Sequence, residues 1–455
     1  MSQPASIDTD PSMTTTAYFQ RAWSEIADAC TRCGKCVEVC PVTPTLPAVA
    51  AVPPAEVISG LFDFMGGGPL SEPTRRFGNG CNSCGVCIPA CPENVNPRRM
   101  VLLSLPRMSA VDKPAPDAFQ KMARATRIFV AMQLLPNDVL RMLKPPKARK
   151  VDVVFHGGCN PVRTPNLLFN LMTLLDALDV NYEFMGGPSS CCGVVHSKWE
   201  GDLKRGEKTS EVTLRRFGEF KPKQVIEWCP TCRLHFNETL EGYRQVEFSI
   251  DHATGLLRER SSTLRSLFTT PVQQRVIVHT HQGMADVGQN VVELLSMVPG
   301  LTIVDVIEEP GYTCGVSGHD RSPELKAQAR PKTLEAMKKS GADALVSLYH
   351  SCHRQLLGEG RVNGFKVINY TDPLVRACGL DPWPDTMEPM AGRNDWANLV
   401  REVMPLLMQN HIDIDPESLL AVMPELFAGA EWKGGLCSFA ASVRASSPSA
   451  SGSTR

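Results

Sequence analysis

CTRCGKCVEVCP at residues 30–41 and CNSCGVCIPACP at residues 81–92 repeat one cysteine pattern near the start of the chain. Both segments have the spacing C-x2-C-x2-C-x3-C-P, which binds [4Fe–4S] clusters. A zinc ribbon is the alternative, but it uses pairs of C-x-x-C and has no need for the third cysteine or the final C-P. The two segments therefore predict two cubane [4Fe–4S] clusters.

The same pattern predicts the ligands of each cluster. Its first three cysteines hold one cluster, and the fourth normally ligates the other cluster of the pair. The first predicted ligand set is Cys30, Cys33, Cys36 and Cys91. The second is Cys81, Cys84, Cys87 and Cys40. Helical patterns at 18–29 and 54–65, before and between the motifs, indicate that helices carry both clusters.

Five further cysteines have a different spacing. They are Cys159, Cys191, Cys192, Cys229 and Cys232. Adjacent thiols are poorly suited to a structural core, but they can bridge two irons. Two alternatives stay open at this point: a zinc site that uses four of the five cysteines, and a redox disulfide between Cys191 and Cys192.

The residues around these five cysteines alternate between strand and helix patterns. Strands are expected at 151–155, 182–185 and 224–228, and an amphipathic helix at 164–178. Such alternation favours a largely parallel α/β layer. Each cysteine group follows the end of a strand, which is where ligands gather in parallel sheets.

The α/β pattern then repeats in a degenerate form, with strands expected at 275–278, 301–306 and 344–348. Aligning Cys192 with Cys314 places His281 at the position of Cys159. Imidazole and thiolate together suit zinc or a modified iron site. The candidate ligands are His281, Cys314 and Cys352 with either His350 or His353. The alternatives are a decayed domain without metal and a second non-cubane cluster.

Composition limits the function classes. The chain has 455 residues, 17 cysteines and a formal net charge of -1, so nothing indicates a nucleic-acid partner. The first residues lack the apolar core of a secretory signal, and the longest apolar stretches fall short of the ~20 residues that span a bilayer. We expect a cytoplasmic protein, and peripheral attachment to the inner face of the membrane is the alternative. Dense cysteine in a reducing compartment indicates metal or redox chemistry.

The motifs together resemble those of the heterodisulfide reductase superfamily, whose cysteine-rich "CCG" domain shares the spacing of the five-cysteine set. The resemblance covers about 20–380 and extends to the fused heterodisulfide reductase catalytic subunit and to the iron–sulfur subunits of glycolate and lactate oxidising complexes. It implies an α+β multidomain fold, in which an α-helical ferredoxin domain precedes two Rossmann-like CCG domains, the second degenerate. It also implies that the five cysteines hold one non-cubane [4Fe–4S] cluster.

The expected boundaries follow from these patterns. They are a disordered tail at 1–17, a helical ferredoxin domain at 18–145, CCG domains at 151–258 and 271–380, a helical segment at 381–437 and a second disordered tail at 438–455.

Two functions are consistent with the resemblance. In the first, the chain is a redox-catalytic subunit whose five-cysteine cluster handles a thiol, a disulfide or another acceptor. In the second, it is a non-catalytic relay between a flavin dehydrogenase and quinone. A zinc-bearing scaffold is a minor third option. The sequence has no dinucleotide or flavin motif, so we expect a flavin-containing or other redox subunit as partner, with a quinone or a membrane subunit as a further option.

Overall fold

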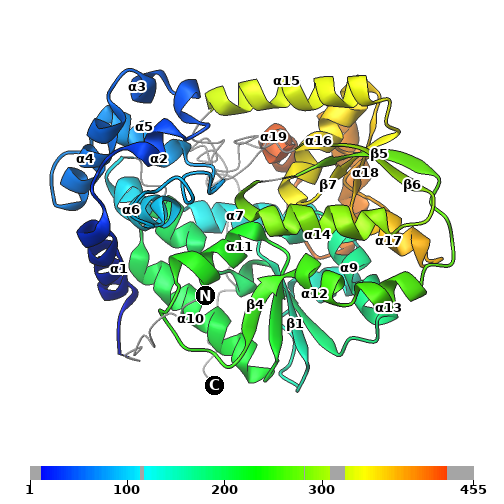
Figure 1. The fold of residues 1–455 in the computed structure, drawn as a ribbon. Helices are drawn as coiled ribbons and strands as arrows, with labels where there is room; N and C mark the ends of the chain where they lie inside the picture. Colours follow the sequence, from blue (N-terminus) through cyan, green and yellow to red (C-terminus); the bar gives the residue numbers. More distant parts are fainter. Residues whose placement is uncertain (1–11, 113–116, 281, 308–322, 428–455) are drawn as a thin grey trace, which may run out of the picture.

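The computed structural model describes residues 12–112, 117–280, 282–307 and 323–427 (Figure 1). The chain forms a helical N-terminal region and two four-stranded sheets, each covered by helices (Figure 1). Mixed helix and parallel sheet agrees with the α+β class expected from the sequence, whereas the expected domain boundaries stay predictions. Among the described residues, no helix has the length and apolar character needed to cross a membrane.

The N-terminal region is built from helices around the two repeated cysteine motifs. Helix α4 occupies the residues where the sequence predicts a helix; a proline at its first position and buried Val57, Ile58 and Leu61 at helical spacing account for it. The helices are α1 (Thr15–Ala29), α2 (Lys35–Glu38), α3 (Pro47–Ala50), α4 (Pro54–Met65), α5 (Glu72–Gly80), α6 (Pro97–Asp112), α7 (Ala118–Ala131) and α8 (Pro136–Leu143).

The first sheet has the strand order β2-β1-β3-β4, and all its strands are parallel. Every residue of the inner strand β1 is buried, as expected for a parallel sheet covered on both faces. The strands are β1 (Val153–Gly158), β2 (Tyr182–Gly186), β3 (Gln224–Glu227) and β4 (Ser249–His252). The helices are α9 (Pro165–Ala177), α10 (Leu203–Glu219), α11 (Pro230–Leu234), α12 (Ala253–Glu259) and α13 (Ser261–Ser266).

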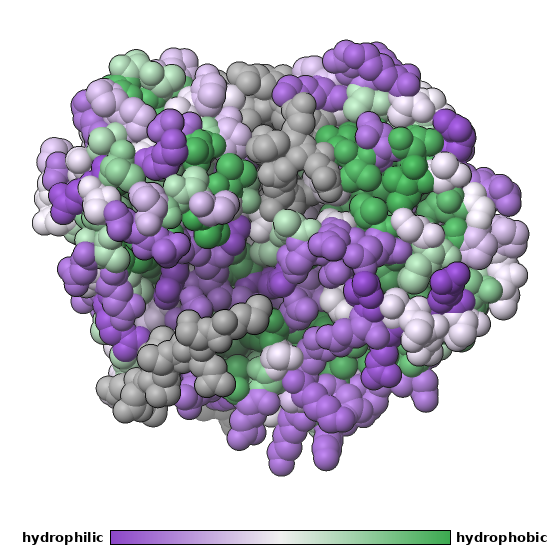
Figure 2. Space-filling model, viewed as in Figure 1, coloured by the Kyte–Doolittle hydropathy of each residue, from purple (hydrophilic) through white to green (hydrophobic). Residues whose placement is uncertain are grey.

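The second sheet repeats this topology with the order β6-β5-β7-β8, again parallel throughout. Its strands are β5 (Gln274–His279), β6 (Leu301–Ile307), β7 (Ala344–Ser347) and β8 (Lys366–Asn369). The helices of this half are α14 (Ala285–Ser296), α15 (Pro323–Ser340), α16 (His350–Asn363), α17 (Thr371–Ala377), α18 (Trp396–Gln409) and α19 (Pro416–Phe427). Apolar side chains gather over this sheet at the upper right of Figure 2.

The two sheets pack together through two pairs of helices, with one helix of each pair from either half. Helix α12 of the first half contacts α14 of the second, and α9 contacts α17. One continuous apolar core extends through both sheets. Asn170 on α9 strengthens the contact, because its amide donates to Asp372 Oδ1 at 2.6 Å and accepts from the Trp383 N–H at 2.8 Å. The repeat read from the sequence is thus visible as two sheets of equal strand order.

A second apolar core joins the N-terminal helices to the first sheet. Tyr18 on α1 donates to the backbone carbonyl of Glu241 at 2.7 Å, and Arg98 on α6 forms an ion pair with Glu238. The helix-borne cysteine motifs are therefore held against the part of the chain that carries the five-cysteine set.

Candidate metal centres

The five-cysteine set converges at the carboxyl ends of three neighbouring strands of the first sheet. Cys159 directly follows β1, Cys191 and Cys192 follow β2 after a short turn at Pro188–Ser190, and Cys229 and Cys232 lie just beyond β3. The side chains of all five are buried. Sequence-distant thiols meet here because parallel strands end at the same edge of the sheet.

The thiols of this set form one connected chain. Cys191 interacts with Cys159 and with Cys192, and Cys232 interacts with Cys192 and with Cys229. Hydrogen bonds from Cys191 and Cys232 hold the pKa of Cys192 well below the usual thiol value, whereas the pKa values of Cys191 and Cys232 are raised well above it.

Two glycines with positive φ lie next to cysteines of this set, Gly158 before Cys159 and Gly193 after Cys192. Gly158 has φ +72°, and a Cβ at this position would lie 3.5 Å from both the Cys229 Cβ and the Cys232 Sγ. Gly193, with φ +89°, has no room for a Cβ, which would lie 2.5 Å from the Gly206 carbonyl oxygen and from the Ser210 Oγ. The positive φ of both residues favours glycine, and at Gly193 the surrounding atoms also leave no space for a Cβ.

Side chains of α10 hold the vicinal cysteines from one side. Ser210 Oγ donates to the Cys192 carbonyl and Thr213 Oγ1 donates to the Cys191 carbonyl, each at 2.7 Å. The Gly193 N–H points to the Cys191 Sγ at 3.4 Å. Both vicinal carbonyls thus accept hydrogen bonds from hydroxyl groups. The sulfur atoms are then the groups of this loop that can serve as metal ligands.

A buried histidine connects the loops behind the thiols. His156 Nε2 donates to the Ser190 carbonyl at 2.6 Å, and its Nδ1 lies 2.6 Å from the Glu227 Oε2. His156, Glu227 and Cys232 place their ligand atoms within 4.8 Å of one another. Burial lowers the pKa of His156, but the Glu227 carboxylate outweighs it and raises this pKa to about 9. Burial also raises the pKa of Glu227.

Four residues that support the site belong to none of the cysteine motifs: His156, Glu227, Ser210 and Thr213. A usable signal was present for two of them, because His156 and Glu227 are polar residues at the carboxyl ends of otherwise apolar strands. Ser210 and Thr213 lie on an amphipathic helix with many polar residues, where nothing in the sequence distinguishes them.

The eight cysteines of the repeated motifs fall into two groups in the structure. One pocket is lined by Cys30, Cys33, Cys36 and Cys91. In the other group, the charges of Cys81, Cys84 and Cys40 all act on Cys87, whose pKa is raised mainly by burial. The fourth cysteine of each motif therefore lies with the first three of the other motif, which is the grouping that the sequence predicts.

The two motif loops have the same backbone conformation. Arg32 and Ser83 occupy equivalent positions with φ of 58° and 62°, and Gly34 and Gly85 do so with φ of 77° and 78°. The Arg32 N–H points to the Cys30 Sγ at 3.4 Å. Fifteen cysteines are described and all are free thiols. Loops that wrap around four thiols, with backbone N–H groups directed at sulfur, fit a [4Fe–4S] cube; iron ligation itself stays a prediction.

The candidate metal site of the second half can be followed only in part, because His281 and Cys314 lie outside the described residues. Cys352, His350 and His353 are buried near the start of α16. His353 has partners at both ring nitrogens, Ser347 Oγ at 2.9 Å and Asp385 Oδ2 at 2.6 Å. Metal ligation by His353 would require one of these bonds to break. His350 Nδ1 has no hydrogen-bond partner among the described residues, and this site stays a prediction.

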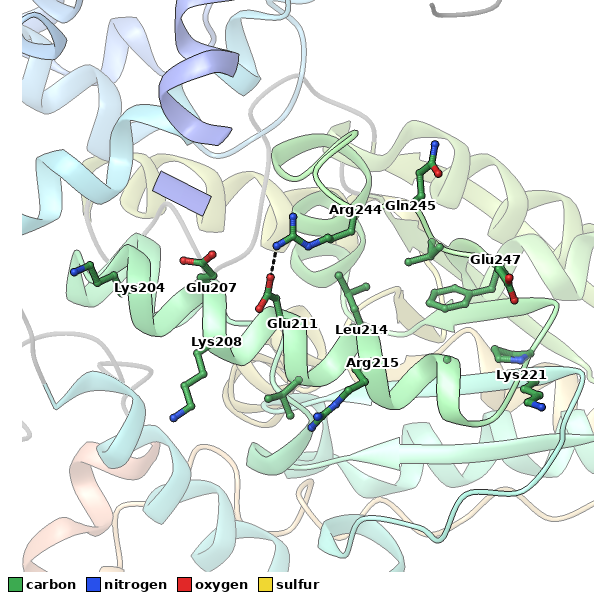
Figure 3. A pocket seen from close by; sticks show the side chains of 15 residues that line it. Lys204, Glu207, Lys208, Glu211, Leu214, Arg215, Lys221, Arg244, Gln245 and Glu247 are labelled. Atoms are coloured by element: carbon green, nitrogen blue, oxygen red, sulfur yellow. Dashed lines mark hydrogen bonds and ion pairs between the residues drawn. The ribbon is translucent and has the colours of Figure 1, made fainter. Parts of the chain in front are cut away.

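A large groove of about 990 Å³ lies on the outer face of α10 (Figure 3). Lys204, Lys208 and Arg215 line it, and Arg244 reaches across to Glu211 (Figure 3). The opposite face of the same helix carries Ser210, which holds Cys192. The helix, about 10 Å in diameter, therefore separates the groove from the five thiols.

Comparison with known proteins supports the assignment of the cysteine-rich region. Residues 153–237 match the family of cysteine-rich domains called CCG. This range contains all five cysteines of the set.

The chain is also similar to one subunit of the fumarate reductase (CoM/CoB) of Methanothermobacter marburgensis, with 23% identity over 313 residues. The alignment covers 66% of this chain and 62% of that protein. The chain therefore spans less than two thirds of the length of this relative.

Proposed function

We propose that this chain is the iron–sulfur subunit of a heterodisulfide-reductase-like oxidoreductase complex. Electrons would move between two cubane [4Fe–4S] clusters on the N-terminal helices and one non-cubane [4Fe–4S] cluster on the five-cysteine set, which would handle a thiol, a disulfide or another acceptor. The observation that carries the proposal is the convergence of five buried, mutually contacting cysteines beside two separate groups of four.

When bound, the clusters would supply one-electron oxidation and reduction. The protein's own contribution is to fix the sulfur atoms and to exclude water. Cys159, Cys191 and Cys192 are brought together by strand ends and by hydroxyl donors from α10. Because hydrogen bonds to neighbouring thiols and burial raise the pKa values of Cys191 and Cys232, a bound positive centre is the natural way to stabilise several thiolates there.

The groups of four lie close to each other, as a relay between clusters needs. The charge of Cys36, in the first group, acts on Cys87 in the second. The second group is in turn near the first sheet, because the charge of Lys198, which follows the CCG triplet, acts on Cys81. Along the molecule, the group of four that contains Cys30 would then come first, the group of four that contains Cys81 second, and the five-cysteine set third.

A second candidate function is a relay without catalysis, in which the chain links a flavin dehydrogenase of the glycolate, lactate or glycerol-3-phosphate type to quinone. Burial of the five thiols favours this candidate, since none is more than 9% exposed. In both functions the substrate domain would belong to a partner subunit. The distant relative is itself called a subunit, which supports a multi-subunit assembly.

Spectroscopy of the anaerobic full chain separates the two candidates. Small thiols, disulfides and a soluble quinone are added in turn while electron paramagnetic resonance and visible absorption are recorded. A spectral change confined to the five-cysteine centre supports catalysis. It should disappear in Cys192→Ser and persist in the control Cys378→Ser, which removes a cysteine outside the three groups. Spectra that respond to none of the thiols or disulfides support the relay.

A further inference from the structure

One arginine side chain packs against the loop of the second cysteine motif. Arg98 lies at the start of α6, and its side chain is only 12% exposed. Its Nη1 donates to the carbonyl of Ser83, the residue before Cys84, at 3.0 Å. A Cβ added to Gly85, the residue after Cys84, would lie 2.9 Å from the same nitrogen. The guanidinium group therefore lies against the backbone on both sides of a predicted cluster ligand.

Two further segments of the chain hold the same guanidinium group. Nη1 also donates to the Gly283 carbonyl at 3.0 Å. Nε donates to Glu238 Oε1 at 2.9 Å, and Nη2 donates to the other oxygen of this carboxylate. The Glu238 side chain is 14% exposed, so the whole ion pair is largely removed from solvent. The positive charge is thus fixed in place, with the cysteine loop at Nη1 and the carboxylate at the Nε and Nη2 edge.

The first cysteine motif has a different neighbour at the equivalent glycine. A Cβ added to Gly34 would lie 2.3 Å from the Ala55 nitrogen and 2.4 Å from the Pro54 carbonyl carbon, which belong to the first turn of α4. A helix N-terminus carries about half a unit charge, whereas arginine always carries a full charge. Arg32 of the first loop is exposed, so solvent screens its charge. The two loops share one backbone conformation but differ in the charge packed against them.

Stability alone does not account for a charge at Arg98. Burial removes the hydration of both charges, so a buried ion pair is weak evidence for stabilisation. The carbonyls of Ser83 and Gly283 need only a hydrogen-bond donor, which an uncharged amide also supplies. The charge does reach the ligand set: burial raises the pKa values of Cys81 and Cys84, and the charge of Arg98 opposes this effect at both.

We propose that Arg98 raises the reduction potential of the [4Fe–4S] cluster on the group of four that contains Cys81, and that Glu238 limits this effect. Reduction adds one negative charge to a cluster, so a fixed cation beside its loop stabilises the reduced form. A nearby carboxylate has the opposite effect. This inference rests on the proposed function and adds to it the residue pair that tunes the middle centre of the relay.

An anaerobic redox titration of the full chain, followed by electron paramagnetic resonance, tests the pair. The signal of the second cluster is the one that Cys84→Ser alters. Arg98→Gln keeps a hydrogen-bond donor but removes the charge, so the potential of this cluster should fall. At an effective dielectric constant of about 20, a unit charge within about 12 Å changes a one-electron equilibrium about tenfold or more, and each factor of ten corresponds to about 59 mV. Glu238→Gln removes the opposing charge, so the potential should rise.

Shifts of opposite sign distinguish an electrostatic role from a structural one. Both variants break the same ion pair, so a loss of packing would move the potential in the same direction in both. Arg98→Lys retains the charge and should stay closer to the parent potential than Arg98→Gln does. The signal of the group that contains Cys30 is the internal reference, and it should shift less in every variant.

Arg99→Gln is the matched control. Arg99 is the next residue of α6 and also pairs with a glutamate, Glu241, but its remaining side-chain bond of 2.7 Å is to the Tyr18 hydroxyl on α1. This variant removes the same charge from the same helix and should leave the potential of the second cluster unchanged.

Unshifted potentials in Arg98→Gln and Glu238→Gln, or shifts of the same sign, would overturn the proposal. If Arg98→Gln does not fold, as judged by circular dichroism, Glu238→Gln decides: a constant or lower potential overturns the proposal. Iron content is measured on every sample. A chain without the clusters would contradict the proposed function and this inference with it, whereas a full set of clusters with unshifted potentials would contradict this inference alone.

Discussion

Glu227 Oε2 lies 2.6 Å from His156 Nδ1, and neither side chain has any exposure to solvent. The two residues face each other across the parallel strands β1 and β3. Since the His156 Nε2 is also bonded to the carbonyl of Ser190, this pair connects the strand before Cys159, the strand before Cys229 and the turn before Cys191. This buried pair therefore contributes to the geometry of the five-cysteine set, together with the hydroxyl contacts from α10.

Removal of this histidine should destabilise the fold strongly. In His156→Ala the Glu227 carboxyl remains buried without its partner, and breaking a buried pair in this way costs about 3–5 kcal/mol. The urea midpoint followed by circular dichroism measures the loss. Glu227→Gln keeps a hydrogen-bonding group of the same size, so its midpoint should fall much less. Equal midpoints for His156→Ala and the parent chain would show that the pair does not hold the loops.

Loss of one thiol from the five-cysteine set should remove one cluster and leave the other two. Cys191→Ser is expected to reduce the iron content by about four per chain, because Cys191 contacts two other thiols of the set. The matched control is Cys378→Ser, since Cys378 is half-buried and belongs to none of the three groups. Full iron content in Cys191→Ser would remove this residue from the ligand assignment.

Because the fourth cysteine of each motif is assigned to the cluster of the other motif, we can predict which cysteine variants alter the same paramagnetic signal. Cys91→Ser should alter the same paramagnetic signal as Cys33→Ser, because both line the first pocket. Cys40→Ser should alter the same signal as Cys84→Ser, since the charges of Cys81 and Cys84 both act on Cys40. Electron paramagnetic resonance of the reduced proteins checks the pairing. Spectra that pair Cys40 with Cys33 instead would show that each motif holds its own cluster.

His252 should make stability depend on pH below neutrality. Burial and the charge of Arg233 lower its pKa to about 3, against about 6.5 in an unfolded chain. Between these values the unfolded state binds a proton that the folded state does not, so the free energy of unfolding falls as the pH drops below about 6.5, by up to ~1.4 kcal/mol per pH unit. Above pH 7 this contribution is constant.

The variant His252→Asn tests this dependence, because asparagine does not titrate and can still cap α12, as His252 does by accepting from the Thr254 N–H. Urea unfolding of both proteins is compared from pH 5.5 to 8. The stability difference should shift in favour of the variant as the pH falls. A difference that is independent of pH would mean that His252 is not the titrating group.

The sequence was sufficient for the parts of the fold that regular patterns encode. The apolar spacing in 54–65 gave α4, and the strands around Cys159 and Cys229 were located to within a few residues. The spacing of the cysteine motifs led to the two ligand sets, and the structure places the members of each set near one another, whereas their ligation of iron stays a prediction.

The contacts that support the site could not be predicted in the same way. The bonds of Ser210 to Cys192 and of Arg98 to Glu238 join segments that are far apart in sequence, and they depend on tertiary packing that local patterns do not encode. His353 shows the converse: its position beside Cys352 suggested a metal ligand, whereas the fold supplies hydrogen-bond partners for both of its ring nitrogens.

Metal analysis of the anaerobically purified full chain tests the central claim most directly. Three four-iron clusters predict about twelve irons and a similar amount of acid-labile sulfide per chain, with paramagnetic signals on reduction. A colourless protein with four or fewer irons, or with zinc at the cysteine groups, would contradict the account.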